Sequence, residues 1–238
     1  MTRVCVVGAA GRMGRLIVAA LADHPSARAV GAIVSSSSAA VSQPTGIAGL
    51  IHTADLAAGV SGADLVLDFS TPTVTPTVVE TCARHNTPVL VGTTGHTPEA
   101  LAALMRYGAD VPLALVPNTS VGVLVLRRLA RQAQEILGPD FDVAIFDLHH
   151  RHKRDAPSGT ADLLATELAG RGAAVPVASL RGGDVPGEHT VLLLGPAERL
   201  ELTHRVRDRG VFAAGALRLG LALVGRPAGV YRAEDLVA

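Results

Sequence analysis

Short apolar runs alternate with segments of helical periodicity through the first half of the chain, and this alternation restricts the fold more than any other feature. The apolar runs are residues 4–7, 29–34, 65–67, 88–91 and 113–116. Helical periodicity follows three of them, at 13–21, 77–85 and 98–107. Short strands separated by amphipathic helices are typical of a parallel sheet with right-handed crossovers. We therefore expect an α/β fold with a Rossmann-like domain.

The second half of the chain has a different pattern. Residues 121–137 predict a long helix, 141–148 a strand, and 191–194 and 200–206 two strands with little helix between them. This order predicts a smaller α+β domain with a mixed sheet. Residues 211–224 then return to helical periodicity. We expect a dinucleotide-binding domain at 1–119, completed by 210–238, and a substrate-binding domain at 120–209.

Composition excludes several classes of protein. Hydrophobic residues make up 48% of the chain and charged residues 18%, which is typical of a folded globular protein and excludes disorder as the main state. No apolar run is long enough to cross a membrane. The net charge of +0 gives no reason to expect a nucleic-acid partner. Cys5 and Cys82 lie in apolar segments, and the first residues lack a signal-peptide pattern, so we expect a cytoplasmic protein.

A glycine-rich loop joins the first strand to the first helix. Gly8, Gly11 and Gly14 permit a tight turn, a close approach of a pyrophosphate and close helix–strand packing. The alternative is a turn that only packs, but the strand–turn–helix context favours a dinucleotide site. A NAD site of this type usually has an acidic residue after the second strand. Here Ser35 and Ser36 stand there, so the choice between NADH and NADPH stays open.

The most polar stretch of the chain runs from Asp147 to Ala161. Three of the nine histidines and the sole lysine, Lys153, lie within residues 149–153, and the other 20 basic residues are all arginine. A basic loop followed by a helix N-terminus suits an anionic substrate. Zinc binding by His149, His150 and His152 is an alternative, but no second ligand cluster accompanies them. A solvated basic loop is another. Proton transfer by a histidine fits best, because its pKa lies near working pH.

The whole set of motifs resembles the 4-hydroxy-tetrahydrodipicolinate reductases, the dihydrodipicolinate reductase family. The histidine–lysine string and the following Asp155 to Ala161 are the most specific part. Further matching strings are Gly11 to Gly14, Asp68 to Ser70, Val91 to Gly95, Pro117-Asn118, Ser179 to Gly183, Gly187 to Thr190 and Glu201 to His204. The resemblance covers nearly the whole chain.

The resemblance implies a two-domain enzyme that reduces a cyclic imine dicarboxylate with NADH or NADPH. It also implies a homotetramer built through the sheet of the second domain. His149 matches the catalytic acid/base and Lys153 its partner. The implied substrate-binding residues are His150, Ser158, Gly159 and Thr160. The implied cofactor-binding residues are Gly8, Ala9, Ala10, Gly11, Arg12, Met13, Ser35, Ser36, Gly92, Thr93, Thr94, Val116, Pro117, Asn118 and Thr119.

The chain departs from the family pattern at two places. Thr119 stands where an aromatic residue is common, and Ser35 and Ser36 stand where acidic or basic residues are frequent. Two other functions are compatible with the glycine loop: another Rossmann-type oxidoreductase acting on an imine or amino acid, and a non-catalytic dinucleotide sensor. The string from His149 to Thr160 argues against the sensor, because binding a dinucleotide requires none of it.

Overall fold

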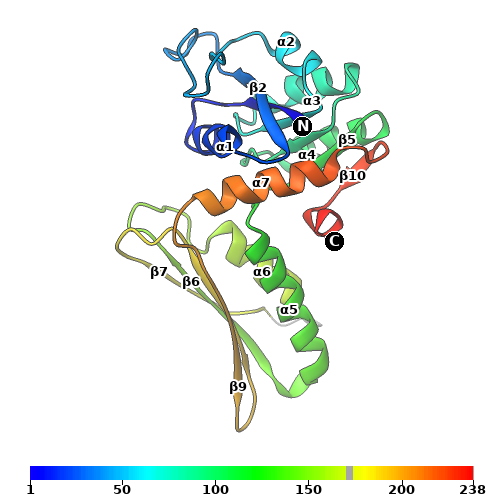
Figure 1. The fold of residues 1–238 in the computed structure, drawn as a ribbon. Coiled ribbons are helices and arrows are strands. Elements are labelled where there is room, and N and C mark those ends of the chain that lie inside the picture. The colour runs from blue at the N-terminus through cyan, green and yellow to red at the C-terminus, as the bar shows by residue number, and fades with distance from the viewer. Residues whose placement is uncertain (170–173, 238) are drawn as a thin grey trace. The chain divides into compact units, whose positions relative to one another are not determined.

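The computed structural model describes residues 1–169 and 174–237, which form two compact units. Unit 1 is Met1–Thr119 together with the segment that begins at Gly210, and unit 2 is Ser120–Arg209. Each unit has its own sheet (Figure 1). Unit 2 is therefore a single continuous insertion into unit 1.

Unit 1 is built on a six-stranded sheet in which every pair of neighbouring strands is parallel. Along the sheet the order is β10-β5-β4-β3-β1-β2. The strands are β1 (Thr2–Val7), β2 (Ala27–Ile33), β3 (Leu65–Asp68), β4 (Val89–Val91), β5 (Pro112–Leu115) and β10 (Gly229–Tyr231). The residues of the central strands β3, β4 and β5 are almost all buried, which explains why these strands read as continuous apolar runs.

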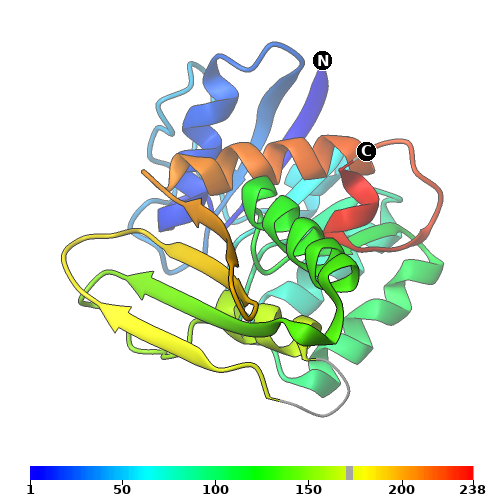
Figure 2. The same cartoon turned by 90° about the horizontal axis from the view of Figure 1, so that it is seen from below.

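Helices cover both faces of this sheet. On one face α2 (Leu56–Ser61), α3 (Thr75–Arg84) and α4 (Pro98–Met105) pack their Val60, Val78 and Leu104 on a core that includes Val66 of β3. On the other face lie α1 (Arg12–Ala22) and α7 (Gly210–Leu223), which pack together (Figure 2). A Cβ at Gly220 of α7 would lie 2.7 Å from Leu67 Cδ2, so α7 approaches β3 closely. Leu67 and Val66 point to opposite faces because side chains alternate along a strand.

Unit 2 is a four-stranded mixed sheet with two helices on one face. The strands are β6 (Asp142–His149), β7 (Val177–Arg181), β8 (Glu188–Leu194) and β9 (Arg199–Arg205), in the order β7-β6-β8-β9. β7 runs parallel to β6, and the other pairs are antiparallel. The helices α5 (Val121–Leu137) and α6 (Gly159–Leu168) bury Leu126 and Leu164 against Ile145 and Val191.

The expected α/β class, with a parallel Rossmann-like sheet and a separate mixed sheet, is confirmed. Some elements were not predicted. In the edge strand β7, residues alternate between half-buried and exposed, so the strand has no apolar run to predict it. β10 and α2 are too short to give a periodic signal. The predicted helix at 98–107 is α-helical to Met105 and continues as a 3₁₀ turn, Arg106–Ala109. Among the described residues, no helix is long and apolar enough to span a bilayer.

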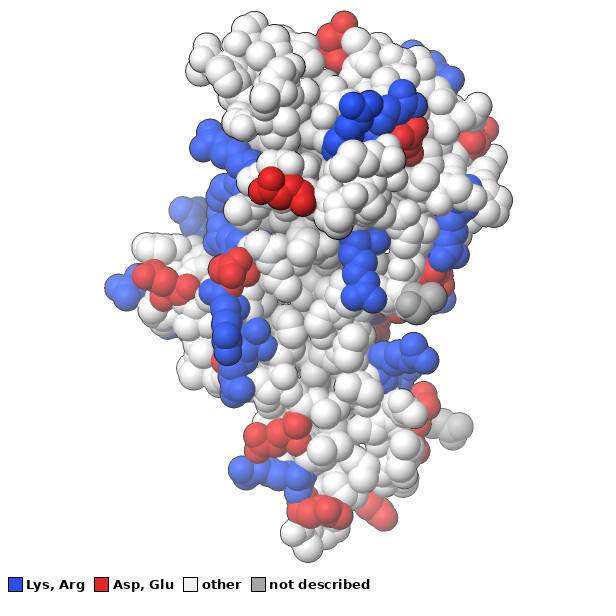
Figure 3. Space-filling view, viewed as in Figure 1, with Lys and Arg blue, Asp and Glu red and all other residues white. Residues whose placement is uncertain are grey.

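Charged side chains of both signs are interspersed over the molecular face in Figure 3. Several basic groups are paired with carboxylates on the surface, such as Arg3 with Asp64 and Arg205 with Glu188. Exposed pairs of this kind contribute little to stability.

Candidate functional site

The glycine loop of unit 1 has the backbone geometry that a dinucleotide requires. Gly8 has φ +78°, and a Cβ on it would lie 2.3 Å from the carbonyl oxygen of Phe69. A Cβ on Gly14 would lie 2.1 Å from the carbonyl oxygen of Gly8. Gly11 is the N-cap of α1 and provides no side-chain cap, so the first N–H groups of the helix face the loop. The loop can therefore hold a pyrophosphate at the positive end of the α1 dipole.

The other residues expected to bind a cofactor lie at the carboxyl ends of the strands of unit 1. Ser35 and Ser36 follow β2 and are exposed, and Ser35 Oγ lies 2.9 Å from Ser37 Oγ. Gly92 follows β4, where a Cβ would lie 2.3 Å from the Phe69 ring. Thr119 is buried and donates a hydrogen bond from Oγ1 to the carbonyl oxygen of Phe212, at 2.7 Å. In open parallel sheets this edge is where ligands bind. The residues concerned are Gly8 to Met13, Ser35, Ser36, Gly92 to Thr94 and Val116 to Thr119.

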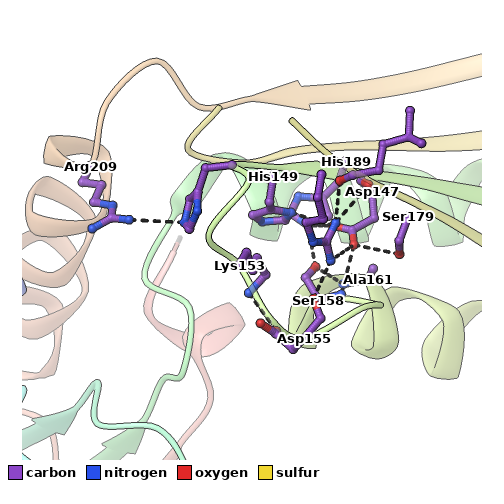
Figure 4. Close-up of polar contacts among 12 residues, drawn as sticks. Asp147, His149, Lys153, Asp155, Ser158, Ala161, Ser179, His189 and Arg209 are labelled. Carbon is purple, nitrogen blue, oxygen red and sulfur yellow. Dashed lines mark hydrogen bonds and ion pairs between the residues drawn. The ribbon is translucent and has the colours of Figure 1, made fainter. Parts of the chain in front are cut away.

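A buried carboxylate, Asp147 near the end of β6, organises the polar stretch of unit 2 (Figure 4). Its Oδ2 accepts hydrogen bonds from Ser158 N, Ser179 Oγ and Arg181 Nη2, each at 3.0 Å. Burial opposes the ionisation of Asp147, but these hydrogen bonds from Ser158, Arg181 and Ser179 outweigh it and lower its pKa to about 2. Asp147 is therefore a permanent anion at neutral pH.

His149 ends β6 two residues after Asp147, so both side chains lie on the same face of the sheet. The Nδ1 of His149 lies 2.8 Å from Oδ1 of Asp147. Burial lowers the pKa of His149, the Asp147 carboxylate acts to raise it, and Lys153 and Arg181 lower it further. Burial is the largest of these causes, so the pKa of His149 is lowered overall.

Lys153 and His150 lie on the loop that follows β6. The Nζ of Lys153 is 2.7 Å from Oδ2 of Asp155, and the lysine side chain is 22% exposed. His150 lies beyond the end of the strand, with its Nε2 3.5 Å from Arg209 Nη2. The two adjacent histidines therefore have different surroundings, and only His149 contacts the buried carboxylate.

Ser158, Gly159 and Thr160 form the start of α6. Ser158 is the N-cap, and its Oγ accepts from Ala161 N at 3.2 Å. The same oxygen lies 3.1 Å from Nε2 of His189, a buried residue of β8. A Cβ at Gly159 would meet no heavy atom within 4 Å, so there is open space beside the helix N-terminus. A carboxylate fits here because the positive end of the helix dipole favours an anion.

Asp147, His149 and His189 each bring one potential ligand atom within 4.8 Å of the others, a spacing compatible with a metal ion. This trio shares only His149 with the three histidines considered from the sequence. The other oxygen of Asp147 is already bound by the Arg181 guanidinium and two further donors. A cation on the same carboxylate disfavours a second one nearby, so we interpret the trio as a proton-handling group rather than as metal ligands.

Four residues of this network had no role in the sequence analysis: Asp147, Ser179, Arg181 and His189. The last three lie within strings that resemble the family, but the strings alone give no chemistry. The signal that was available is the spacing of Asp147 and His149, two residues apart on a predicted strand.

Two family models match the chain in tandem, described as dihydrodipicolinate reductase, N-terminus, over residues 2–119, and dihydrodipicolinate reductase, C-terminus, over residues 122–237. The chain belongs to the dihydrodipicolinate reductase family. This confirms the resemblance drawn from the sequence motifs.

Curated relatives cover the same span. A protein of Anaeromyxobacter dehalogenans strain 2CP-1 named 4-hydroxy-tetrahydrodipicolinate reductase is 40% identical, covering 100% of this chain and 98% of the relative. A protein of the same name from Myxococcus xanthus is also 40% identical with the same coverage. Among solved structures, dipicolinate-bound dihydrodipicolinate reductase from Paenisporosarcina sp. TG-14 matches with a TM-score of 0.83 at 22% identity over 100% of both chains. That dihydrodipicolinate reductase thus shares the fold of this chain.

Proposed function

We propose that the protein is a 4-hydroxy-tetrahydrodipicolinate reductase, which reduces the dehydrated cyclic imine dicarboxylate to tetrahydrodipicolinate on the diaminopimelate route to lysine. Family membership and full-length relatives with this name support the reaction class. The observation that carries the proposal is the contact set around Asp147, which joins His149 and the start of α6 within one unit. A proton donor beside an anion site is what reduction of an imine dicarboxylate requires.

In this proposal unit 1 binds NADH or NADPH and unit 2 binds the substrate. The glycine loop would hold the pyrophosphate, because Gly8 and Gly14 permit a tight backbone turn at the start of α1 that a Cβ at either position would prevent. Gly92 to Thr94 and Val116 to Thr119 would line the nicotinamide side. When bound, the reduced nicotinamide supplies a hydride to the conjugated ring of the substrate.

His149 would supply the proton that balances the hydride. A general acid must be protonated before reaction, and the neighbouring Asp147 carboxylate favours the imidazolium that burial disfavours. A proton affinity tuned in this way is typical of catalytic acids.

The two substrate carboxylates would be bound by cations and by N–H donors. Lys153 and His150 come from the basic loop, and Ser158, Gly159 and Thr160 from the start of α6. Charge-assisted hydrogen bonds of this kind are about twice as strong as neutral ones. Lys153 now pairs with Asp155, and a substrate carboxylate would compete with Asp155 for the ammonium.

The open face of the unit 2 sheet would form a homotetramer interface. The helices α5 and α6 cover the opposite face, and Leu180 of β7 is 55% exposed. In the described part of unit 2, no helix packs on that open face. An exposed apolar sheet face is typical of a protein–protein interface. Light scattering after size-exclusion chromatography tests the tetramer.

We place the enzyme in the cytoplasm, in agreement with Cys5 and Cys82 as buried free thiols.

A coupled assay tests the reaction. Fresh 4-hydroxy-tetrahydrodipicolinate is supplied by the preceding synthase, and oxidation of NADH or NADPH is followed at 340 nm in parallel reactions. We expect synthase-dependent oxidation that vanishes in a His149→Ala variant. Dinucleotide binding without turnover would instead favour the non-catalytic sensor. Turnover only with other imines or amino acids would favour another oxidoreductase of this fold.

A further inference from the structure

One row of polar side chains crosses the whole unit 2 sheet. Ser179 of β7 is in register with Asp147 of β6, Asp147 with His189 of β8, and His189 with His204 of β9. Residues in register on neighbouring strands point to the same face, here the face under α5 and α6. The N-cap serine of each helix contacts this row: Ser158 Oγ lies 3.1 Å from His189, and Ser120 Oγ lies 3.4 Å from His204.

The two oxygens of Asp147 have different surroundings. Oδ2 accepts three hydrogen bonds, whereas Oδ1 faces two imidazoles, His149 Nδ1 at 2.8 Å and His189 Nε2 at 3.5 Å. Neither contact of Oδ1 has the alignment of a hydrogen bond, so the carboxylate acts on both rings mainly through its charge. A ring nitrogen that faces a permanent anion retains its proton when the imidazole is neutral.

We propose that Asp147 and His189 are positioning residues, each of which fixes the place of one proton. Asp147 keeps a proton on Nδ1 of His149, so that Nε2 exchanges the catalytic proton. His189 turns the Ser158 hydroxyl proton toward the substrate. The catalytic meaning of this assignment rests on the proposed reductase function. The positions of the two protons do not depend on that function.

The surroundings of His149 agree with proton exchange at Nε2. Asp147 lies at Nδ1, while Nε2 faces Gly187, where a Cβ would lie 3.0 Å from it. The other charged or titratable groups that act on His149 are Arg181 on β7, Lys153 on the following loop, and His189 on β8. Asp147 is an anion, whereas Arg181 and Lys153 are cations and the His189 ring is neutral. Removing the Asp147 charge therefore leaves two cations and a neutral ring around His149.

His189 determines what the Ser158 hydroxyl can donate to. Burial, with smaller effects from neighbours such as His149, lowers the pKa of His189 to about 4, so the ring is neutral at pH 7. Two acceptors, Asp147 Oδ1 and Ser158 Oγ, surround its Nε2, and among the described residues its Nδ1 has no hydrogen-bond partner. The single ring proton therefore belongs on Nε2.

Ser158 Oγ then accepts from His189 Nε2 and from Ala161 N. A hydroxyl oxygen has two acceptor sites, and both are now used. The remaining O–H is left to donate outward, to a substrate carboxylate.

Nuclear magnetic resonance of protein labelled with ¹⁵N and ¹³C in histidine tests the proposed positions of the ring protons. His149 is assigned by the signal that disappears in His149→Gln. In the wild type we expect neutral His149 to carry its proton on Nδ1 and neutral His189 on Nε2. The opposite tautomer of His149 overturns the proposal for Asp147, and the opposite tautomer of His189 overturns it for Ser158. The tautomers are read in the wild-type protein, and the variant serves only to assign the signal.

Two variants separate the charge of Asp147 from a general effect. Asp147→Asn should lower the pKa of His149 by about one to three units, because the anion at Nδ1 is lost. Asp142→Asn removes a charge from the exposed start of the same strand and should leave the titration of His149 unchanged. Equal titration of His149 in all three folded proteins overturns the assignment. If Asp147→Asn does not fold, the wild-type tautomer decides.

Binding of pyridine-2,6-dicarboxylate, a planar dicarboxylate, tests the role of His189 without turnover. His189→Leu removes the N–H donor to Ser158, whereas His189→Gln places an amide N–H near the same point. By calorimetry we expect about ten- to hundredfold weaker binding for His189→Leu and recovery to within about threefold for His189→Gln. In the reductase assay the loss should appear in KM more than in kcat. Equal affinity of the leucine and wild-type proteins overturns the role of His189. Dicarboxylate binding without reduction by the wild type contradicts the proposed function instead.

Discussion

The ammonium of Lys153 lies 2.7 Å from the carboxylate of Asp155, two residues further along the loop after β6. Lys153 is the sole lysine and the other 20 basic residues are arginine, so this is the one side chain with a compact ammonium. We predict that Lys153→Ala lowers kcat/KM by about ten- to more than a hundredfold, the loss of a charged hydrogen bond to substrate. Lys153→Arg should recover little, since a planar guanidinium does not fit a compact site.

Arg154→Ala is the matched control, because it removes an exposed positive charge from the next position of the loop. It should change kcat/KM by less than about threefold, as expected for an exposed group. Reductive methylation gives a second measurement, since only Lys153 and the α-amino group react. Pyridine-2,6-dicarboxylate should protect Lys153 from the reagent. Equal labelling with and without the dicarboxylate, together with full activity after methylation, would mean that Lys153 has no role in the site.

His149→Ala or His149→Gln should lower kcat by about 10²–10⁴, the range for loss of a general acid, with little change in dinucleotide affinity. The adjacent His150 is the control, because it contacts Arg209 rather than the buried carboxylate. His150→Ala should act mainly on KM. If His150→Ala abolished kcat while His149→Ala did not, the two roles would be reversed.

Gly187→Ala should lower kcat by about tenfold, because the new Cβ would lie 3.0 Å from His149 Nε2 and displace the ring. Gly182→Ala is the matched control in the same unit, since a Cβ there would meet no atom within 4 Å. Circular dichroism establishes that both variants are folded. Unchanged kcat in Gly187→Ala would show that the ring tolerates the methyl group.

The protein should lose stability as the pH falls from 6.5 to 4. Folded His189 has a pKa of about 4, below the unfolded value of 6.5, so the unfolded state binds a proton first. The stabilisation by neutral His189 is complete above pH 6.5 and is lost as the pH falls toward 4. Urea unfolding at pH 7.5 and 5.0 gives the free energy of unfolding at each pH. Between these two pH values the wild type should lose about 2 kcal/mol more of this free energy than His189→Gln. Parallel losses in the two proteins would contradict this.

The enzyme should use NADH and NADPH with less than about tenfold discrimination, because each decade of preference needs about 1.4 kcal/mol from a specific contact. The exposed Ser35 and Ser36 follow β2, where a carboxylate would favour NADH. Arg12, the exposed first residue of α1, is the nearest candidate cation for a 2′-phosphate. Values of kcat/KM for the two dinucleotides test this, and a preference above a hundredfold either way contradicts it. Ser36→Asp should shift the preference toward NADH.

The parallel sheet was predictable because burial on both faces leaves a strong sequence signal. Leu65 to Leu67 and Val89 to Val91 read as strands since nearly every residue in them is inside. The edge strand β7 gave no such signal, because one face of Val177–Arg181 is open. Its position decides the site, since Ser179 and Arg181 reach Asp147 from β7.

The candidate site was predictable where its chemistry is local in sequence. His149, Lys153 and Ser158 lie within ten residues of one another and end on one loop and one helix start. The contact between Asp147 and His189 escaped prediction because it depends on strand register, which pairs these residues 42 positions apart. A buried carboxylate also resembles any other acidic residue until its donors are known.

The hydrogen bond from Thr119 to the carbonyl of Phe212 joins the last residue before unit 2 to the first turn after it. The chain therefore leaves the parallel-sheet unit and returns to it at neighbouring points. Whole domains are tolerated as insertions where the two joined ends lie close together. In genetic terms, the stretch from Ser120 to Arg209 is a single cassette, and exchanging it interrupts no strand of the parallel sheet. Under the proposed function, replacing this one continuous piece of the gene changes the substrate and leaves the dinucleotide site of unit 1 intact.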